Sequence, residues 1–104
     1  MENAKIIIPN GTTYNIKSIT IKYLEETLIV TTIEDKIFTY DINDIRNIIT
    51  HDNIYTLDFL DNDDLRITSI SFENKDLFIE FVNNIIRCIS KIRRDNLQED
   101  IIIL

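Results

Sequence analysis

Residues 66–94, RITSISFENKDLFIEFVNNIIRCISKIRR, contain the change of hydrophobic period that decides the fold. Up to Phe72, apolar and polar residues alternate, which predicts a half-buried β-strand. Asn74 is a favourable N-cap, and Asp76 falls in a first helical turn, where the helix dipole favours an anion. The apolar residues then follow helical spacing on one broad face: Leu77, Phe78, Phe81, Val82, Ile85, Cys88, Ile89 and Ile92. The stretch therefore predicts a last strand followed by one amphipathic helix that ends near residues 95–96.

The chain before residue 66 consists of short apolar segments, mostly alternating, that are separated by turn signals. We expect strands over residues 6–8, 14–24, 27–33, 36–42, 44–50 and 54–60, the segment 44–50 being a short strand or a bend. The alternation changes phase around Ser18, so a β-bulge is expected there. Turns are expected at residues 25–26, 34–36, 51–53 and 61–64. Because these turns are short and join consecutive strands, they predict an antiparallel meander.

This order of elements, with strands over residues 5–72 and a helix over residues 74–94, resembles the pleckstrin-homology-like superfold. The resemblance covers nearly the whole chain and rests on the order of elements, not on a specific motif. It implies an α+β, mainly β fold, with a bent antiparallel sheet or split barrel of about seven strands capped by one C-terminal amphipathic helix. We expect a single domain over residues 1–96 and an apolar C-terminal tail over residues 97–104.

Members of that superfold bind inositol phosphates, peptides or proteins, and the inositide-binding members carry a basic cluster around their first hairpin. In this chain the corresponding lysines, Lys5, Lys17 and Lys22, are scattered and are followed by Glu25 and Glu26. The resemblance therefore does not imply inositide binding here.

Composition limits the classes of partner. The 104 residues carry a formal net charge of −7, and an acidic surface repels nucleic-acid phosphates and anionic lipid. No apolar run approaches the roughly 20 residues that a membrane span needs. Cys88 is the only cysteine, so no intrachain disulfide can form. We expect a cytoplasmic protein with no nucleic-acid or membrane partner, and the abundance of isoleucine and asparagine suggests an AT-rich bacterial or phage genome.

Residues that could carry catalysis are sparse. The single glycine, Gly11, excludes a glycine-rich phosphate-binding loop and a dinucleotide fingerprint. His51 lies beside Asp52 in an expected turn, where a histidine is ordinarily solvated, and Cys88 lies on the apolar helix face, where a cysteine packs as a small hydrophobe. The cluster DNDD lacks the glycine and the distal glutamate of a calcium loop. We therefore expect no enzymatic activity, no cofactor and no bound metal.

Two segments are candidates for partner binding. The first is the acidic turn that contains Asp61, Asp63 and Asp64, which would suit a basic partner surface. The second is the apolar C-terminal tail of Ile101, Ile102, Ile103 and Leu104. The tail has three interpretations: an eighth strand on its own sheet, a contact with a second copy in a homodimer through sheet edges or swapped tails, or a recognition segment for another protein.

The leading hypothesis is a small acidic protein-interaction module without enzymatic activity, acting as an inhibitor, immunity or adaptor protein by binding another protein. One alternative is a small-molecule or nucleotide sensor with a pocket between sheet and helix. Four tyrosines at strand positions would be candidates for lining it: Tyr14, Tyr23, Tyr40 and Tyr55. A second alternative is a structural homo-oligomer component, since the basic end of the helix could meet the acidic turn of another copy.

Overall fold

The computed structural model describes residues 4–61, 66–88 and 102–103, without the side chains of residues 61, 66, 102 and 103. Within these ranges the chain forms eight strands, a short 3-10 helix and one α-helix. In chain order they are β1 (Ala4–Ile7), β2 (Thr13–Lys22), β3 (Thr27–Thr32), β4 (Ile37–Asp41), η1 (Ile42–Asp44), β5 (Ile45–His51), β6 (Ile54–Asp61), β7 (Arg66–Phe72), α1 (Lys75–Cys88) and β8 (Ile102–Ile103).

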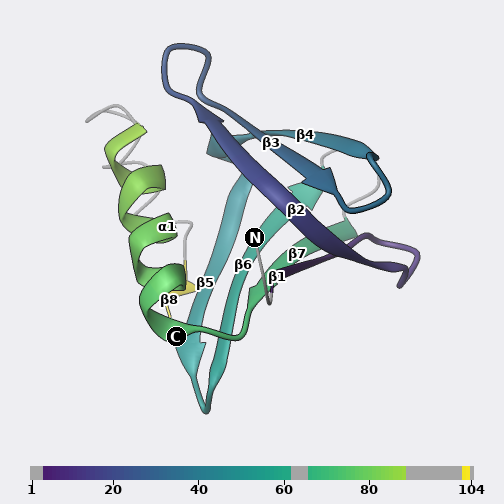
Figure 1. The fold of residues 1–104 in the computed structure, drawn as a ribbon. Helices are drawn as coiled ribbons and strands as arrows, with labels where there is room; N and C mark the ends of the chain where they lie inside the picture. The colour runs from purple at the N-terminus through teal and green to yellow at the C-terminus, as the bar shows by residue number, and fades with distance from the viewer. Residues whose placement is uncertain (1–3, 62–65, 89–101, 104) are drawn as a thin grey trace.

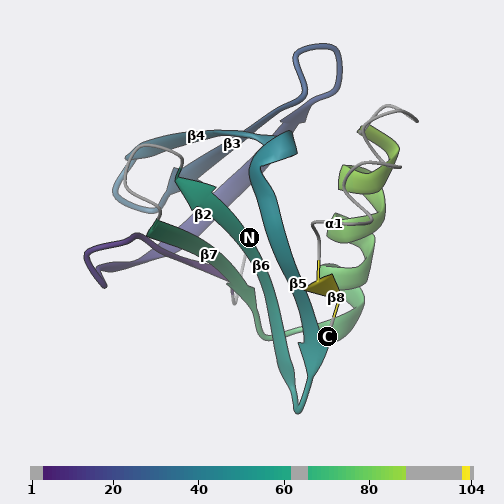
Figure 2. The same ribbon diagram turned by 180° about the vertical axis from the view of Figure 1, so that it is seen from behind.

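The strands form one sheet in the order β4-β3-β2-β1-β7-β6-β5-β8. Neighbouring strands are antiparallel except β5 and β8, which are parallel. β1 pairs with β2 on one side and with β7 on the other, so it joins the two meanders. The sheet curls into a half-barrel, and α1 lies along its open side (Figure 1; Figure 2). This arrangement confirms the predicted mainly β fold with a bent antiparallel sheet and a C-terminal helix.

Local sequence signals account for the bulge and the turns. The pairing of β2 with β3 shifts by one residue between Ile16 and Ser18, which confirms the bulge expected near Ser18. Asp52 and Asn53 form the two-residue turn between β5 and β6 with φ values of 54° and 61°. Asn and Asp tolerate this left-handed region better than other residues with a Cβ, and two such residues suit the twist of a tight hairpin.

The start of α1 follows the expected capping. The side-chain oxygen of Asn74 accepts a hydrogen bond from the Leu77 amide at 3.1 Å, which confirms Asn74 as the N-cap. The helix buries Phe78, Phe81, Ile85 and Cys88. Leu77 was expected on the buried face but is 44% exposed, because it lies at the margin of the face that meets the sheet. The expected continuation of the helix to residue 94 lies outside the described residues.

The core fills the concave side of the sheet beneath α1. Phe78 lies near its centre, fully buried, with its ring centroid 5.6 Å from that of Phe72 and 6.0 Å from that of Tyr55. Tyr40 stacks on Phe59 at 5.2 Å and links the strands of the two meanders. Each large side chain buried in this way contributes about 1.5–3 kcal/mol to stability. The aromatic contacts therefore hold the helix and both halves of the sheet together.

The described part of the tail pairs with the chain's own sheet. Ile102 lies opposite Asn47 and Ile103 opposite Ile48, in a parallel pairing of β8 with β5. Of the three interpretations of the tail, this pairing supports the eighth strand. Ile101 and Leu104 lie outside the described residues.

Candidate partner-binding surface

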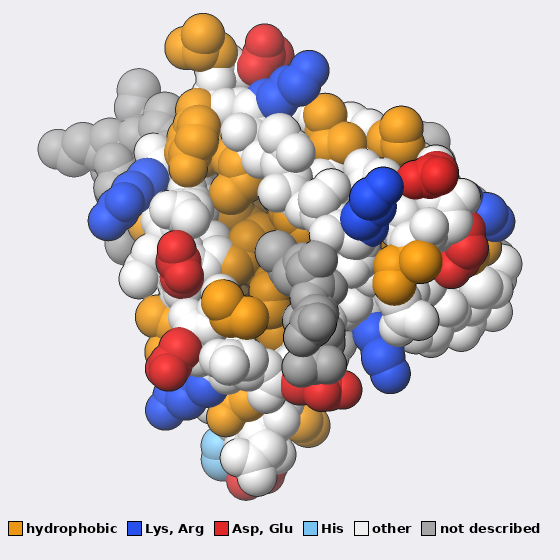
Figure 3. Space-filling model, viewed as in Figure 1, with side chains coloured by type: hydrophobic (Ala, Val, Ile, Leu, Met, Phe, Trp, Pro, Cys, Tyr) orange, Lys and Arg blue, Asp and Glu red, His pale blue; other side chains and the backbone are white. Residues whose placement is uncertain are grey.

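An apolar groove separates α1 from β2. Figure 3 shows hydrophobic side chains gathered in a hollow between these two elements. The groove has a volume of about 240 Å³. It is lined by Ile19, Ile21, Phe72, Leu77, Glu80, Phe81 and Asn84, and we call this set the α1–β2 groove.

The groove forms where the apolar face of β2 faces the apolar stripe of α1. Beyond the bulge, the period-two alternation of β2 places Ile19 and Ile21 on the face that points toward the helix. On α1, residues Leu77 and Phe81 are four apart and therefore lie on one stripe. The Phe81 ring stacks on the Phe72 ring at 5.1 Å with an interplanar angle of 30°. Strand, helix and stacked rings thus give the groove apolar walls.

One rim of the groove is acidic. Glu80 is exposed at the groove, and Asp76 lies one helical turn before it on the same side of α1. Within residues 4–61 and 66–88, neither carboxylate has an ion-pair partner. The helix rim therefore presents negative charge that no described cation neutralises.

The turn that follows β2, the strand that lines the groove, presents an exposed leucine. Leu24 is 97% exposed, and Tyr23, which continues the alternation of Ile19 and Ile21, is 50% exposed. Large apolar side chains on a monomer's surface are common singly, but here two adjacent ones follow the strand that lines an apolar groove. We call Tyr23 and Leu24 the hairpin tip.

Hydrogen bonds hold the base of the hairpin tip in place. The Glu26 amide donates to the Tyr23 carbonyl at 3.3 Å, and Glu26 takes a φ of 52° to close the turn. The Asn43 side-chain amide donates to the Glu26 carboxylate at 2.7 Å, and the Ile42 amide donates to the Glu26 carbonyl at 2.9 Å. These contacts from η1 fix the direction in which the turn leaves the sheet, so Leu24 is displayed on an ordered support.

Cys88 also supports the hairpin tip. Its thiol donates a hydrogen bond to the Tyr23 carbonyl, with Sγ and oxygen 3.5 Å apart. Burial raises the pKa of the Cys88 thiol, and the negative charge of Glu26 raises it further. A raised pKa disfavours the nucleophilic thiolate. Cys88 is thus a buried packing residue, as expected from its place on the apolar helix face.

The sequence nominated a different set of residues as candidates for partner binding. Asp61 is the last residue of β6 and pairs with Arg66, whereas Asp63 and Asp64 lie outside the described residues. Ile102 and Ile103 are occupied in β8. The acidic turn therefore stays a prediction, and the described part of the tail is committed to the sheet.

None of the four tyrosines is among the groove-lining residues of the described chain. Tyr14 packs against Phe38 with ring centroids 5.6 Å apart, and the Lys36 ammonium lies 4.6 Å from the centre of the Tyr14 ring. Tyr40 and Tyr55 serve the core contacts with Phe59 and Phe78 described above. Tyr23 belongs to the hairpin tip.

The chemically active side chains are dispersed. His51 lies at the end of β5, and its Nε2 is 3.1 Å from an Asp52 carboxylate oxygen, with both side chains more than 70% exposed. No group of three or more His, Cys, Asp or Glu side chains within the described ranges is placed to hold a metal ion.

A buried carboxylate on β6 was not found from the sequence. Asp58 is only 7% exposed and accepts hydrogen bonds from the Asn47 side-chain amide at 3.1 Å and the Ser69 hydroxyl at 2.7 Å. The three residues lie opposite one another on β5, β6 and β7. Because both acceptor oxygens are engaged by neighbouring strands, the cluster satisfies a polar group inside the sheet.

Comparison of the chain with protein-family models, curated proteins and solved structures gives no match. The resemblance to the pleckstrin-homology-like superfold therefore stays a prediction from the order of elements. Among the described residues, α1 is too short and too polar to cross a membrane.

Proposed function

We propose that this chain is a small acidic protein-interaction module without enzymatic activity, which binds another protein through the α1–β2 groove and the hairpin tip. Acting in the cytoplasm as an inhibitor, immunity or adaptor protein of a bacterium or phage, it would need no cofactor. The observation that carries the proposal is an almost fully exposed leucine on an ordered turn, directly after the strand that lines an apolar groove with an unneutralised acidic rim.

The size of the groove favours a protein over a small molecule as its occupant. Small-molecule pockets usually measure about 300–1,000 Å³ and enclose most of the ligand. The groove, at about 240 Å³, is smaller and open on one side. It suits one or two side chains of a partner, so we favour protein binding over the sensor alternative.

Strand pairing decides which docking modes are open to a partner. β3 pairs with β2 over Ile16–Lys22, whereas β1 pairs on the other side with Thr13–Asn15 only, so among the described residues no strand covers the second edge of β2 over residues 17–22 beside the groove. A partner can therefore add a strand at this edge or dock with side chains from a helix or a loop. Glu80 on the rim favours a lysine or arginine beside the apolar residue of the partner, because opposite charges improve specificity and encounter rate.

The hairpin tip supplies the expected anchor. Burying a leucine side chain contributes about 1.5–3 kcal/mol, or about 10- to 100-fold in affinity. Leu24 exposes nearly its whole side chain, so its contribution on binding should approach this range.

Affinity purification from cells of the source organism tests the proposal. The wild-type chain is compared with Leu24→Asp and Leu77→Asp, which place a charge at the hairpin tip and in the groove. Ile54→Asp is the matched control, because Ile54 is 52% exposed but lies on the β5–β6 hairpin. Circular dichroism establishes that all four chains are folded.

We expect a stoichiometric partner that copurifies with the wild type and with Ile54→Asp, and that binds at least about tenfold more weakly to the two other variants when purified. Retention of the partner by both groove variants would refute the proposed site. Recovery of no stoichiometric partner, together with a thermal shift on adding nucleotides, would favour the sensor alternative instead.

A further inference from the structure

The two edges of the sheet differ in how they are covered. At one edge, β5 pairs with β8 from the chain's own tail. At the other edge lies β4, which pairs with β3 on its inner side. Among the described residues, no strand pairs with the outer side of β4. A bare strand edge is a template for another strand, because its N–H and C=O groups are unmatched.

Hydrogen bonds at both ends of β4 reveal which residues face outward. The Thr32 amide donates to the Lys36 carbonyl at 2.9 Å, and the Ile42 amide donates to the Glu26 carbonyl at the same distance. Hydrogen-bonded pairs alternate along an antiparallel ladder, so Phe38 and Tyr40 direct their backbone groups toward β3. The remaining residues of the strand, Ile37, Thr39 and Asp41, therefore direct their N–H and C=O groups away from the sheet.

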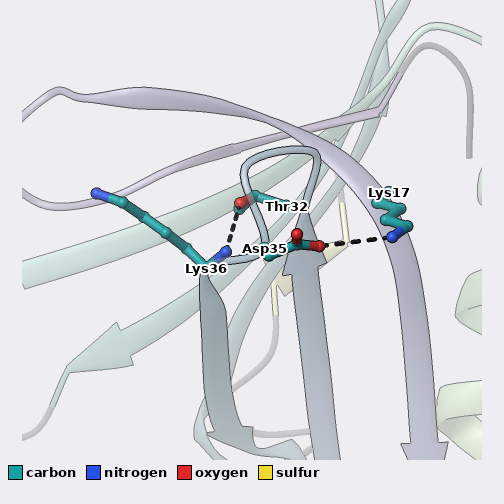
Figure 4. Close-up of polar contacts among 4 residues, drawn as sticks. All are labelled: Lys17, Thr32, Asp35 and Lys36. Atoms are coloured by element: carbon teal, nitrogen blue, oxygen red, sulfur yellow. Dashed lines mark hydrogen bonds and ion pairs between the residues drawn. The ribbon is translucent and has the colours of Figure 1, made fainter.

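The outward residues are accessible. Ile37, Thr39 and Asp41 are all exposed, with Ile37 at 67%. Natural sheet edges are usually blunted by charged side chains, above all lysine, by proline or by a bulge. The outward row of β4 contains one of these, the Asp41 carboxylate at the end of the strand, which accepts hydrogen bonds from the Asn43 backbone and side-chain amides at 2.9 and 2.7 Å. The turn that precedes it is ordered by the Lys36 amide bond to the Thr32 hydroxyl at 3.0 Å and by the Lys17–Asp35 ion pair at 3.5 Å (Figure 4).

We propose that β4 pairs antiparallel with β4 of a second copy of this chain, about a twofold axis at Thr39. The two Thr39 residues would exchange backbone hydrogen bonds, and the two sheets would join into one. This homodimer goes beyond the proposed partner-binding function, because it uses the outer edge of β4, which supplies no residue to the α1–β2 groove.

The side-chain pattern of β4 favours a second copy as the occupant. Antiparallel pairing about Thr39 places Phe38 of each copy opposite Tyr40 of the other, and both side chains are half-exposed in the monomer. Such aromatic cross-strand pairs stabilise a sheet. Lys36 and Asp41 of the two copies would come to the same end of the joined strands but on opposite faces, because side chains alternate along a strand and the Lys36 ammonium bonds to Tyr14 on the Phe38 face. A twofold interface of this kind is self-complementary.

The net charge of the chain opposes this association and makes it sensitive to salt. Each copy carries a formal charge of −7, and salt screens repulsion between like charges. The dimer should therefore tighten as the ionic strength rises.

Sedimentation analysis of the purified chain tests the proposal, with Thr39→Pro as the disruptive variant. Proline removes the outward N–H of residue 39 but none of the β3–β4 bonds, and it is tolerated on edge strands for this reason. Thr39→Val is the matched control, because it keeps the N–H. Leu77→Asp serves as a second control that alters only the groove. If Thr39→Pro fails to fold by circular dichroism, Ile37→Lys replaces it as an edge-blocking charge.

We expect dimers for the wild type, Thr39→Val and Leu77→Asp, and a dimer dissociation constant at least about tenfold higher for Thr39→Pro. A wild type that stays monomeric at several hundred micromolar would overturn the proposal. So would a Thr39→Pro variant that is folded and dimerises as tightly as the wild type, because association would then use another surface.

Discussion

Replacement of Phe78 by alanine tests whether α1 is held on the sheet by the contacts described above. Phe78 has no exposed surface, and its ring packs between those of Phe72 and Tyr55 at centroid distances of 5.6 and 6.0 Å. Removing a fully buried phenylalanine ring usually costs about 3–5 kcal/mol, which combines lost burial with the cavity left behind. We expect a cost near the upper end of this range, because rigid sheet residues on both sides cannot collapse into the space.

The assay is urea denaturation followed by circular dichroism. A chain of this length has a total stability of about 5–15 kcal/mol, so Phe78→Ala should be marginally folded. Ile79→Ala is the matched control, because Ile79 neighbours Phe78 in α1 but is 41% exposed, and it should cost less than about 1 kcal/mol. If the two substitutions lower the free energy of unfolding equally, the helix is not docked through Phe78, and the α1–β2 groove loses its basis.

Three further outcomes follow from the structure. Deleting residues 101–104 should lower the free energy of unfolding by about 1–2 kcal/mol in urea denaturation, because β8 gives β5 a few backbone hydrogen bonds. An unchanged free energy of unfolding would mean that the tail does not pair with its own chain. Because the pKa of the Cys88 thiol is raised in the folded chain, the unfolded chain loses this proton at a lower pH. The free energy of unfolding should therefore fall as the pH rises past the ordinary thiol pKa of about 8.5. Denaturation measured at pH 7 and pH 9.5 checks this, and Cys88→Ala should remove that part of the decline. Asp58→Ala should cost about 1–3 kcal/mol in thermal or urea unfolding, more than Ser69→Ala, because it leaves two donors without their acceptor.

Much of the fold follows from local sequence patterns. Alternation located the strands, the phase change near Ser18 located the bulge, and Asn74 marked the start of the helix. These features depend on residues a few positions apart, so a single sequence contains the necessary information. The predicted fold class was right for the same reason, because short turns force consecutive strands to lie side by side.

The candidate site depends on contacts that the sequence does not specify locally. Leu77 and Phe78 share the same helical face in the pattern, and only the placement of α1 over β2 leaves one in a groove and the other in the core. Asp58 occupies a polar position in an alternating strand, yet neighbours from β5 and β7 enclose it. Leu24 was expected at the end of a strand, just before the turn at residues 25–26, and its proposed role as an exposed anchor depends on η1 supporting that turn from another part of the chain.

The position of β1 has a consequence for how the chain folds. Each meander is built of hairpins between neighbours in sequence, but their union depends on β1 meeting β7, where Ala4 pairs with Phe72. Forming a contact between residues so distant in sequence costs loop-closure entropy before the contact can stabilise the chain. The rate-limiting event of folding should therefore be this closure, so substitutions at the buried Ile6 of β1 should alter the folding rate more than equally mild ones within the local hairpins.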